Sequence, residues 1–349
     1  MQFFLLLRYV SFLPEPGRSQ APFASDPSRQ LNEVYSQFAA PLDDVWTWKN
    51  GSWNNLLIEG ASPSPRVYHT AVSMDKAYIT FGGSAVSAGF LNDTWVLQPE
   101  QAKWAPVEVN QAPPARAGHS AVVMGSNMVL FGGRGAEAVF NDVWTFMPQA
   151  GGIAAGNWNA MKTTNAPSVR TGHAATSLGA GLMLVVGGSG ILGKDMNDVW
   201  LLDTNTHEWL QVDTSKSSAQ PAPRHGHLLQ LLSFAPGSPA QATVVMFGGQ
   251  SGTSDNDPFL RDTWTLQVEV VSGHCKAPLR GLRGACAVSG VWAAAPTAPP
   301  PRAHMAAATY SAEGDIVMFG GFSGYSGGLN DHLLSDSWLL LAGGSEHEN

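Results

Sequence analysis

A three-part landmark recurs along this chain in constant order, and it constrains the fold more than any other feature of the sequence. Each copy begins with an arginine closely followed by a histidine, continues through an apolar run that ends in Gly-Gly, and finishes with Asp-x-Trp. Five copies are present, and the spacings from arginine to arginine are 50, 54, 54 and 78 residues. Because self-similar units of this length each form one supersecondary element, the sequence predicts a repeat protein.

The landmark residues fall into three sets, which we interpret as structural because every copy contains them. The arginines and histidines are Arg66/His69, Arg116/His119, Arg170/His173, Arg224/His227 and Arg302/His304. The glycine pairs are Gly82-Gly83, Gly132-Gly133, Gly187-Gly188, Gly248-Gly249 and Gly320-Gly321. The tryptophans of the five Asp-x-Trp segments are Trp95, Trp144, Trp200, Trp264 and Trp338.

Each unit is predicted to form a four-stranded antiparallel sheet. In the first unit the apolar stretches Thr70–Met74 and Ala77–Phe81 flank the turn residues Asp75 and Lys76, which is typical of a β-hairpin. The Asp-x-Trp segment predicts a third strand, and a further tryptophan downstream predicts a fourth. We name these strands A to D in chain order, and we expect the tryptophans to fill the space between facing sheets.

The order of the landmarks resembles the kelch repeat. The clearest copy is the second unit, with Pro114, Arg116, Gly118, His119, Phe131, Gly132, Gly133, Asn141, Asp142, Trp144 and Trp158. The resemblance covers residues 42–341, and the unit spacing is close to the period of roughly 50 residues of kelch repeats. It implies an all-β fold, a β-propeller in which four-stranded blades stand side by side around a central axis.

The sequence at the two ends of the chain is compatible with either five or six blades. Asp44–Trp46 is a sixth Asp-x-Trp, and with Trp53 it predicts strands C and D of an incomplete blade. We expect six blades, with Phe3–Phe12 as a degenerate strand; the alternative is a five-bladed ring in which the Trp53 strand completes the last blade. Three regions follow: residues 1–41 as a leader or degenerate strand with disorder as an alternative, residues 42–341 as the propeller, and residues 342–349 as a tail without a strand D.

Composition argues against several classes of function. The formal net charge is −8 and the basic residues are scattered, which argues against a nucleic-acid-binding surface or a basic membrane-binding patch. The apolar run at Phe3–Leu7 is interrupted by Arg8 and is too short to span a membrane. The two cysteines, Cys275 and Cys286, could form a bridge or stay as thiols. Such low cysteine usage favours the cytoplasm, with secretion as the alternative.

We expect neither a metal nor a cofactor, and no catalytic residue is predicted. Gly188–Gly193 matches the letters of a dinucleotide-binding loop, but Asp198–Trp200 follows as a strand where that loop needs a helix. The repeated histidines serve every unit alike, so we expect them to make structural hydrogen bonds, with the arginines near the Asp of Asp-x-Trp. His225 and His227 lie two residues apart, but two histidines without a third ligand are weak support for a metal site.

Residues that differ between units are the candidates for function. An antiparallel meander places all B–C loops on one face of the ring, and recognition residues concentrate on loops of a rigid scaffold. The loops at 250–261 and 322–335 are the longest and the least alike. The candidate partner-binding residues on this face are Arg134, Lys194, Gln250, Asp255, Asp257, Phe259, Phe322, Tyr325 and His332.

The resemblance to kelch repeats implies a monomeric, non-catalytic scaffold that binds a protein partner through the B–C loop face. One alternative is a kelch-type enzyme that processes a small or carbohydrate-like ligand in the central cavity. Strand A offers little for acid–base catalysis, however, since it reads Thr70-Ala71-Val72 in the first unit and Ser120-Ala121-Val122 in the second. Another alternative is a fragment of a longer product that has no independent function.

Overall fold

The computed structural model describes residues 4–7, 44–49, 52–149, 152–237, 239–252, 259–273, 284–295, 302–309, 316–319, 337–340 and 346–348. In this part of the chain the regular structure consists of β-strands and two short 3-10 helices, η1 (Pro99–Gln101) and η2 (Ile191–Gly193). The all-β fold of four-stranded sheets predicted from the repeat is confirmed.

Five sheets each contain the strands A to D of one repeat unit in that order, and we name them blades 1 to 5. Blade 1 consists of β4 (Thr70–Met74), β5 (Ala77–Phe81), β8 (Thr94–Gln98) and β9 (Lys103–Pro106). Blade 2 consists of β11 (Ser120–Met124), β12 (Asn127–Phe131), β13 (Val143–Gln149) and β14 (Gly152–Met161). Blade 3 consists of β15 (Ala174–Gly179), β16 (Leu182–Ser189), β17 (Asp195–Asp203) and β18 (Glu208–Gln211).

Blades 4 and 5 follow the same order. Blade 4 consists of β19 (Leu228–Ala235), β20 (Ala240–Phe247), β21 (Thr263–Gly273) and β22 (Gly284–Ala295). Blade 5 consists of β23 (Ala306–Thr309), β24 (Ile316–Phe319), β25 (Ser337–Leu340) and β26 (Glu346–Glu348). Consecutive strands within every blade pair antiparallel, as a meander requires.

Three short strands lie outside this A-to-D pattern. β6 (Ser84–Ala85) and β7 (Gly89–Phe90) form a small hairpin inside the B–C loop of blade 1. β10 (Glu108–Val109) follows strand D of blade 1 and pairs in parallel with β14, the outermost strand of blade 2. Backbone hydrogen bonds therefore connect these neighbouring blades at the outer edge of the ring, in addition to the side chains packed between them.

The N-terminal part of the chain forms a sixth sheet. It consists of β1 (Phe4–Leu7), β2 (Val45–Lys49) and β3 (Ser52–Asn55), and β2 pairs antiparallel with both neighbours. This agrees with the expected sixth blade with a degenerate strand near the N-terminus. The strand that contains Trp53 belongs to this sheet, so it does not complete blade 5.

The prediction that residues 342–349 lack a strand D is wrong. Strand D of blade 5 is β26, which pairs with β25 through Trp338↔Glu348, Leu339↔His347 and Leu340↔Glu346. The segment Glu346–Glu348 has neither the tryptophan nor the apolar residues that mark strand D in the other units. Its place in the sheet therefore comes from backbone pairing, which leaves no signature in the side chains.

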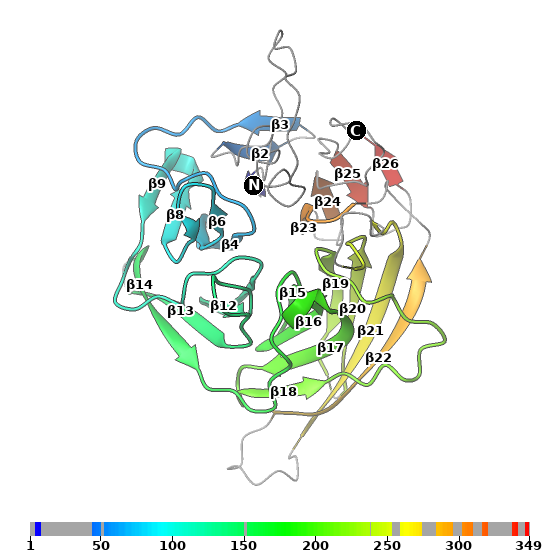
Figure 1. The fold of residues 1–349 in the computed structure, drawn as a ribbon. Coiled ribbons are helices and arrows are strands. Elements are labelled where there is room, and N and C mark those ends of the chain that lie inside the picture. Colours follow the sequence, from blue (N-terminus) through cyan, green and yellow to red (C-terminus); the bar gives the residue numbers. More distant parts are fainter. Residues whose placement is uncertain are drawn as a thin grey trace, which may run out of the picture.

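The six sheets follow one another around a circle in chain order, with the N-terminal sheet between blade 1 and blade 5 (Figure 1). The first strands of consecutive blades, β4, β11, β15, β19 and β23, contact each other in succession. Strand A is thus the inner strand of each blade, and the B–C loops gather at one end of the axis.

The hydrophobic core lies between blades. Trp158 on strand D of blade 2 packs on Phe81 on strand B of blade 1, with ring centroids 4.9 Å apart. Trp209 and Phe131 repeat this contact between blades 3 and 2 at 4.7 Å. Both tryptophans are at most 2% exposed. Each such ring removes on the order of 150–250 Å² from water, which holds neighbouring blades together.

Candidate functional site

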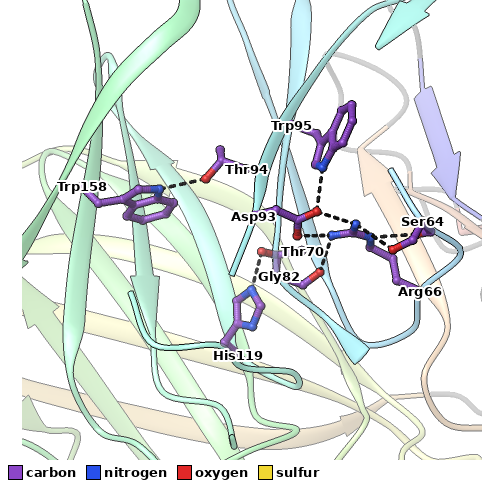
Figure 2. A network of polar contacts seen from close by, with 9 residues as sticks. All are labelled: Ser64, Arg66, Thr70, Gly82, Asp93, Thr94, Trp95, His119 and Trp158. Carbon is purple, nitrogen blue, oxygen red and sulfur yellow. Dashed lines mark hydrogen bonds and ion pairs between the residues drawn. The ribbon is translucent and has the colours of Figure 1, made fainter. Parts of the chain in front are cut away.

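The landmark residues of each unit form a buried polar cluster, which we call the arginine socket. In blade 1 the guanidinium of Arg66 donates hydrogen bonds of 2.6 and 2.7 Å to the carboxylate of Asp93 and one of 3.0 Å to the carbonyl of Gly82 (Figure 2). The indole N–H of Trp95 donates to the same carboxylate at 2.7 Å. The socket therefore joins the start of strand A to the ends of strands B and C.

The arginine socket recurs with the same atoms in blades 2 to 4. Its members there are Arg116–Asp142–Trp144, Arg170–Asp198–Trp200 and Arg224–Asp262–Trp264. Burial raises the pKa of Asp142, but the hydrogen bonds and charge of Arg116 outweigh it and hold this pKa below its usual value. Because each carboxylate neutralises a buried guanidinium, loss of either partner would leave an uncompensated charge or donor, so we assign the socket a structural role.

The repeated histidines link consecutive blades. Nε2 of His119 and Oγ1 of Thr70 lie 2.9 Å apart in a hydrogen bond between blades 2 and 1. Nε2 of His173 and Oγ of Ser120 make the same bond between blades 3 and 2. Burial, together with the nearby arginine, lowers the pKa of His119 to about 3, so this imidazole is neutral near pH 7. These histidines are structural contacts between neighbouring inner strands.

His304 does not belong to this set of histidines, contrary to the sequence-based grouping. Its backbone has a φ of 56°, and its N–H donates to the carbonyl of Gly226 at 2.7 Å. Gly172 and Gly226 make the same bond to the preceding blade from the same backbone conformation. His304 therefore occupies the glycine position of the repeat, two residues after the arginine.

Met305 takes the histidine position in blade 5. A Cβ at Gly187 would touch the ring of His227, and a Cβ at Gly248 would touch the side chain of Met305 in the same way. The shift was visible in the sequence, since His304 follows Arg302 by two residues and the other landmark histidines follow their arginines by three.

Backbone hydrogen bonds connect the glycine positions around the axis. Gly118 N–H donates to Tyr68 at 2.9 Å, Gly172 to Gly118 at 2.8 Å, Gly226 to Gly172 at 2.7 Å, and His304 to Gly226. Tyr68, the first member, also has a left-handed φ of 56°. The rings of Tyr68 and His304 meet edge to face with centroids 5.0 Å apart, so side chains connect the first and last members of the series.

A cavity of about 580 Å³, which we call the axial cavity, lies where the B–C loops meet. Its lining includes Tyr68, His225 and His304 from the starts of strands A, and Ser84, Phe90, Arg134 and Ser189 from the B–C loops. This volume is within the range of roughly 300–1,000 Å³ that is usual for ligand pockets. The axial cavity is therefore the candidate site on the face expected from the sequence.

Three variable positions in each of blades 1 to 4 lie at or beside the axial cavity. The first follows the arginine, the second follows Gly-Gly, and the third lies three residues before the Asp of Asp-x-Trp. In blades 1 to 4 they are Val67, Ser84 and Phe90; Ala117, Arg134 and Val139; Thr171, Ser189 and Asp195; and His225, Gln250 and Phe259. Backbone bridges join the three within each blade, and most of them line the cavity.

Asp195 and His225 form a polar pair that occurs in no other described blade. Nδ1 of His225 donates to the carboxylate of Asp195 at 2.9 Å, and the backbone N–H of Gly252 donates to its second oxygen at 2.7 Å. The Asp195 side chain is 5% exposed and that of His225 is 21% exposed. Asp195 thus fixes the tautomer and orientation of an imidazole that lines the cavity.

The structure describes four of the nine predicted B–C loop residues. Arg134 lines the axial cavity, with its guanidinium carbon 5.8 Å from the centroid of the Phe90 ring. Gln250 and Phe259 occupy variable positions of blade 4, and Lys194 follows η2, but these three are not among the described residues that line the cavity. The other five lie outside the described residues: Asp255, Asp257, Phe322, Tyr325 and His332.

Sequence reasoning placed none of four further residues in this site: Tyr68 and Asp195 were not singled out, His304 was grouped with the repeat histidines, and His225 was weighed only as a metal ligand. Tyr68 and His304 stand where other units have glycine, and Asp195 and His225 stand where other units have mostly apolar residues. Each of these residues differs from the residues at the equivalent positions of the other units. This difference can be recognised only after the structure shows which positions are equivalent.

Other possible sites receive no support from the described residues. Within them no three histidine, cysteine, aspartate or glutamate side chains lie close enough to hold a metal ion. η2 spans three residues and β17 follows it, so the glycines at Gly188–Gly193 precede a strand, as predicted. No helix in this part of the chain has the length and apolar character needed to cross a membrane. Cys275 lies outside the described residues, and the pairing of the two cysteines stays a prediction.

Comparison with known proteins relates this ring to one family. The KLHDC2/KLHL20/DRC7 Kelch-repeats domain matches residues 30–234. Adagio-like protein 3 of Oryza sativa subsp. japonica is 28% identical over 283 residues, 80% of this chain and 41% of that protein. An F-box/kelch-repeat protein of Arabidopsis thaliana is 27% identical over 274 residues, 72% of this chain and 54% of that protein. The chain thus spans about half the length, or less, of these relatives.

Proposed function

This chain belongs to the kelch-repeat family, whose model matches more than half of it, and from that premise we propose that it is a protein-interaction scaffold. Kelch domains generally mediate protein interactions. We further propose that the partner binds the B–C loop face, over the mouth of the axial cavity. The observation that carries this proposal is the gathering of the variable residues of four blades around one cavity.

The distribution of variation supports this face. The arginine sockets use the same residue types in blades 1 to 4, because each joins the strands of its own blade in the same way. The variable positions carry side chains as different as Phe90, Arg134 and His225, all at the cavity. A packing role would favour similar residues in each blade, whereas recognition of one asymmetric partner requires a different side chain from each blade.

Charge-reversal substitutions on the two faces provide the test. Affinity capture from the cells that express the protein compares three tagged proteins. They are the intact chain, the variant Arg134→Glu at the cavity, and the variant Lys76→Glu in the A–B turn of blade 1. Both residues are exposed, and an A–B turn lies on the face opposite to the B–C loops. We expect the same specific proteins with the intact chain and Lys76→Glu, and their loss with Arg134→Glu, at unchanged melting temperatures. Loss with Lys76→Glu alone would assign binding to the opposite face.

A further inference from the structure

Tyr68 and His304 hold the glycine position of the repeat in a backbone conformation that disfavours both. Gly118, Gly172 and Gly226 occupy this position in blades 2 to 4 with φ of 63–64°, and Tyr68 and His304 occupy it with φ of 56°. A left-handed conformation is costly for any residue with a Cβ, and glycine satisfies the same backbone hydrogen bonds in three blades. The backbone does not require these two residues, so we infer that their side chains have a role of their own.

Their side chains begin a row of rings along the cavity wall. Tyr68 is 39% exposed, which is high for an aromatic residue at the centre of a ring of blades. Its ring meets His304 at 5.0 Å, and His304 lies 6.0 Å from His225, measured between centroids. His225 is in turn held by Asp195 at 2.9 Å. The row is thus anchored at one end and offers an exposed aromatic ring at the other.

The lining offers a guanidinium and an exposed ring to a ligand with a π face. Among the described lining residues Arg134 alone has a permanent charge, and its guanidinium already lies over the ring of Phe90. Burial lowers the pKa of His304 to about 4, so this ring adds no charge near pH 7. A guanidinium and an exposed tyrosine ring both bind aromatic rings well, by cation–π and edge-to-face contact respectively.

Hydrogen-bonding groups in the wall select among aromatic ligands. In its neutral form His225 presents Nε2 as a hydrogen-bond acceptor, because Nδ1 donates to Asp195, and this residue lines the cavity. A phenol provides an O–H donor together with an aromatic ring, whereas a phenyl group provides the ring alone.

We propose that the axial cavity receives a tyrosine side chain of the protein partner, packed against Tyr68 and Arg134 with its hydroxyl directed to His225. This inference rests on the proposed scaffold function and names the part of the partner that enters the cavity. The partner's other contacts would lie on the surrounding B–C loops.

Small amino-acid amides test the cavity without knowledge of the partner. Four probes are titrated into the full chain and followed by ligand-observed NMR: N-acetyl-L-tyrosinamide, N-acetyl-L-phenylalaninamide, N-acetyl-L-leucinamide and the anionic α-amide of N-acetyl-L-aspartic acid. We expect saturable binding of the tyrosine amide, weaker binding of the phenylalanine amide, and little of the other two. Equal binding of the leucine amide, tighter binding of the aspartate amide, or no binding of the tyrosine amide would each overturn the proposal.

Tyr68→Gly is the matched variant, because it restores the residue that blades 2 to 4 use. We expect roughly tenfold or greater weakening of tyrosine-amide binding, as the loss of a good aromatic contact implies, at an equal or higher melting temperature. The control is His207→Gly, which relieves the same backbone conformation at an exposed residue outside the described cavity lining. Unchanged binding by Tyr68→Gly, or equal weakening by both variants, would refute the proposal.

Affinity capture tests the scaffold function and amide binding tests the tyrosine inference, so the failure of one can be distinguished from the failure of the other. If Arg134→Glu loses captured proteins and the tyrosine amide does not bind, the scaffold function stands and the tyrosine inference falls. If the amide binds at Tyr68 but capture is insensitive to Arg134→Glu, the cavity accepts a free aromatic ligand, and the assignment to a protein partner is wrong.

Discussion

Thr70 of blade 1 and His119 of blade 2 are joined by a hydrogen bond of 2.9 Å between Oγ1 and Nε2. Ser120 and His173 repeat the bond between the next two blades. The corresponding residue of blade 3 is Ala174, which has no hydroxyl group, and Nε2 of the buried His227 has no hydrogen-bond partner among the described residues. The contact between blades 3 and 4 therefore lacks a polar link that two earlier pairs of blades have.

Ala174→Thr is expected to stabilise the protein by supplying this link. A hydroxyl at position 174 should bond to Nε2 of His227 and raise the free energy of unfolding by about 0.5–1.5 kcal/mol. Denaturant unfolding measures the change. Ala174→Val is the control, because it adds similar volume without the hydroxyl. If both variants shift stability equally, the gain comes from packing and the hydrogen-bond explanation is wrong.

Gly133→Ala is expected to destabilise the ring by more than the strain of its φ alone. Gly133 has a φ of 94°, and an added Cβ would lie 2.8 Å from Cβ of His119 and 2.9 Å from the carbonyl oxygen of Ala117. Gly125→Ala provides the comparison, since Gly125 also has a positive φ but nothing lies within 4 Å of the added Cβ. Thermal melts should show a clearly larger loss for Gly133→Ala, and equal losses would argue against a close approach of the two strands.

Asp142→Ala should unfold the protein more easily because it leaves Arg116 unpaired. The Arg116 side chain is 0% exposed and that of Asp142 is 37% exposed, so solvent screens part of the interaction. We expect a loss of about 2 kcal/mol or more, toward the lower end of what removal of one partner from a buried pair costs. Asp142→Asn keeps an acceptor for Arg116 and Trp144 and should lose less. An equal loss in both variants would mean that charge neutralisation dominates over hydrogen bonding.

Acid should destabilise the protein below about pH 6.5. Burial, aided by neighbouring arginines, lowers the pKa of His69, His119 and His227 to about 3, whereas an unfolded histidine titrates near 6.5. The unfolded chain therefore binds more protons between pH 6.5 and 3, and stability falls as the pH drops through this window. The slope is up to about 1.4 kcal/mol per pH unit for each buried histidine.

Denaturant unfolding at pH 7.5, 6.5 and 5.5 measures this dependence. His119→Gln keeps a hydrogen-bonding side chain next to Thr70 but does not titrate, so its stability should fall less steeply with pH. A free energy of unfolding that stays constant from pH 7.5 to 5.5 would contradict the assignment of neutral buried histidines.

The repeat made most of the fold predictable because its landmarks contact each other within one unit. Arg66, Asp93 and Trp95 lie in one socket, so their order and spacing in the chain carry the geometry of the blade. Strand β26 was not predictable in this way, since Glu346–Glu348 has no apolar or aromatic residue and is held by backbone pairing with β25. The register of His304 was misread for a related reason: the residue type matched the repeat while its position did not.

Sequence periodicity alone establishes the all-β class, the strand order within each blade and the face on which the units differ, because it encodes local pairing. The contacts among the variable side chains depend on the three-dimensional ring. Tyr68 and His304 come from opposite ends of the ring series, and Asp195 and His225 from neighbouring blades. Closure of the ring brings such residues together across long stretches of chain. A contact that occurs only once leaves no periodic pattern in the sequence.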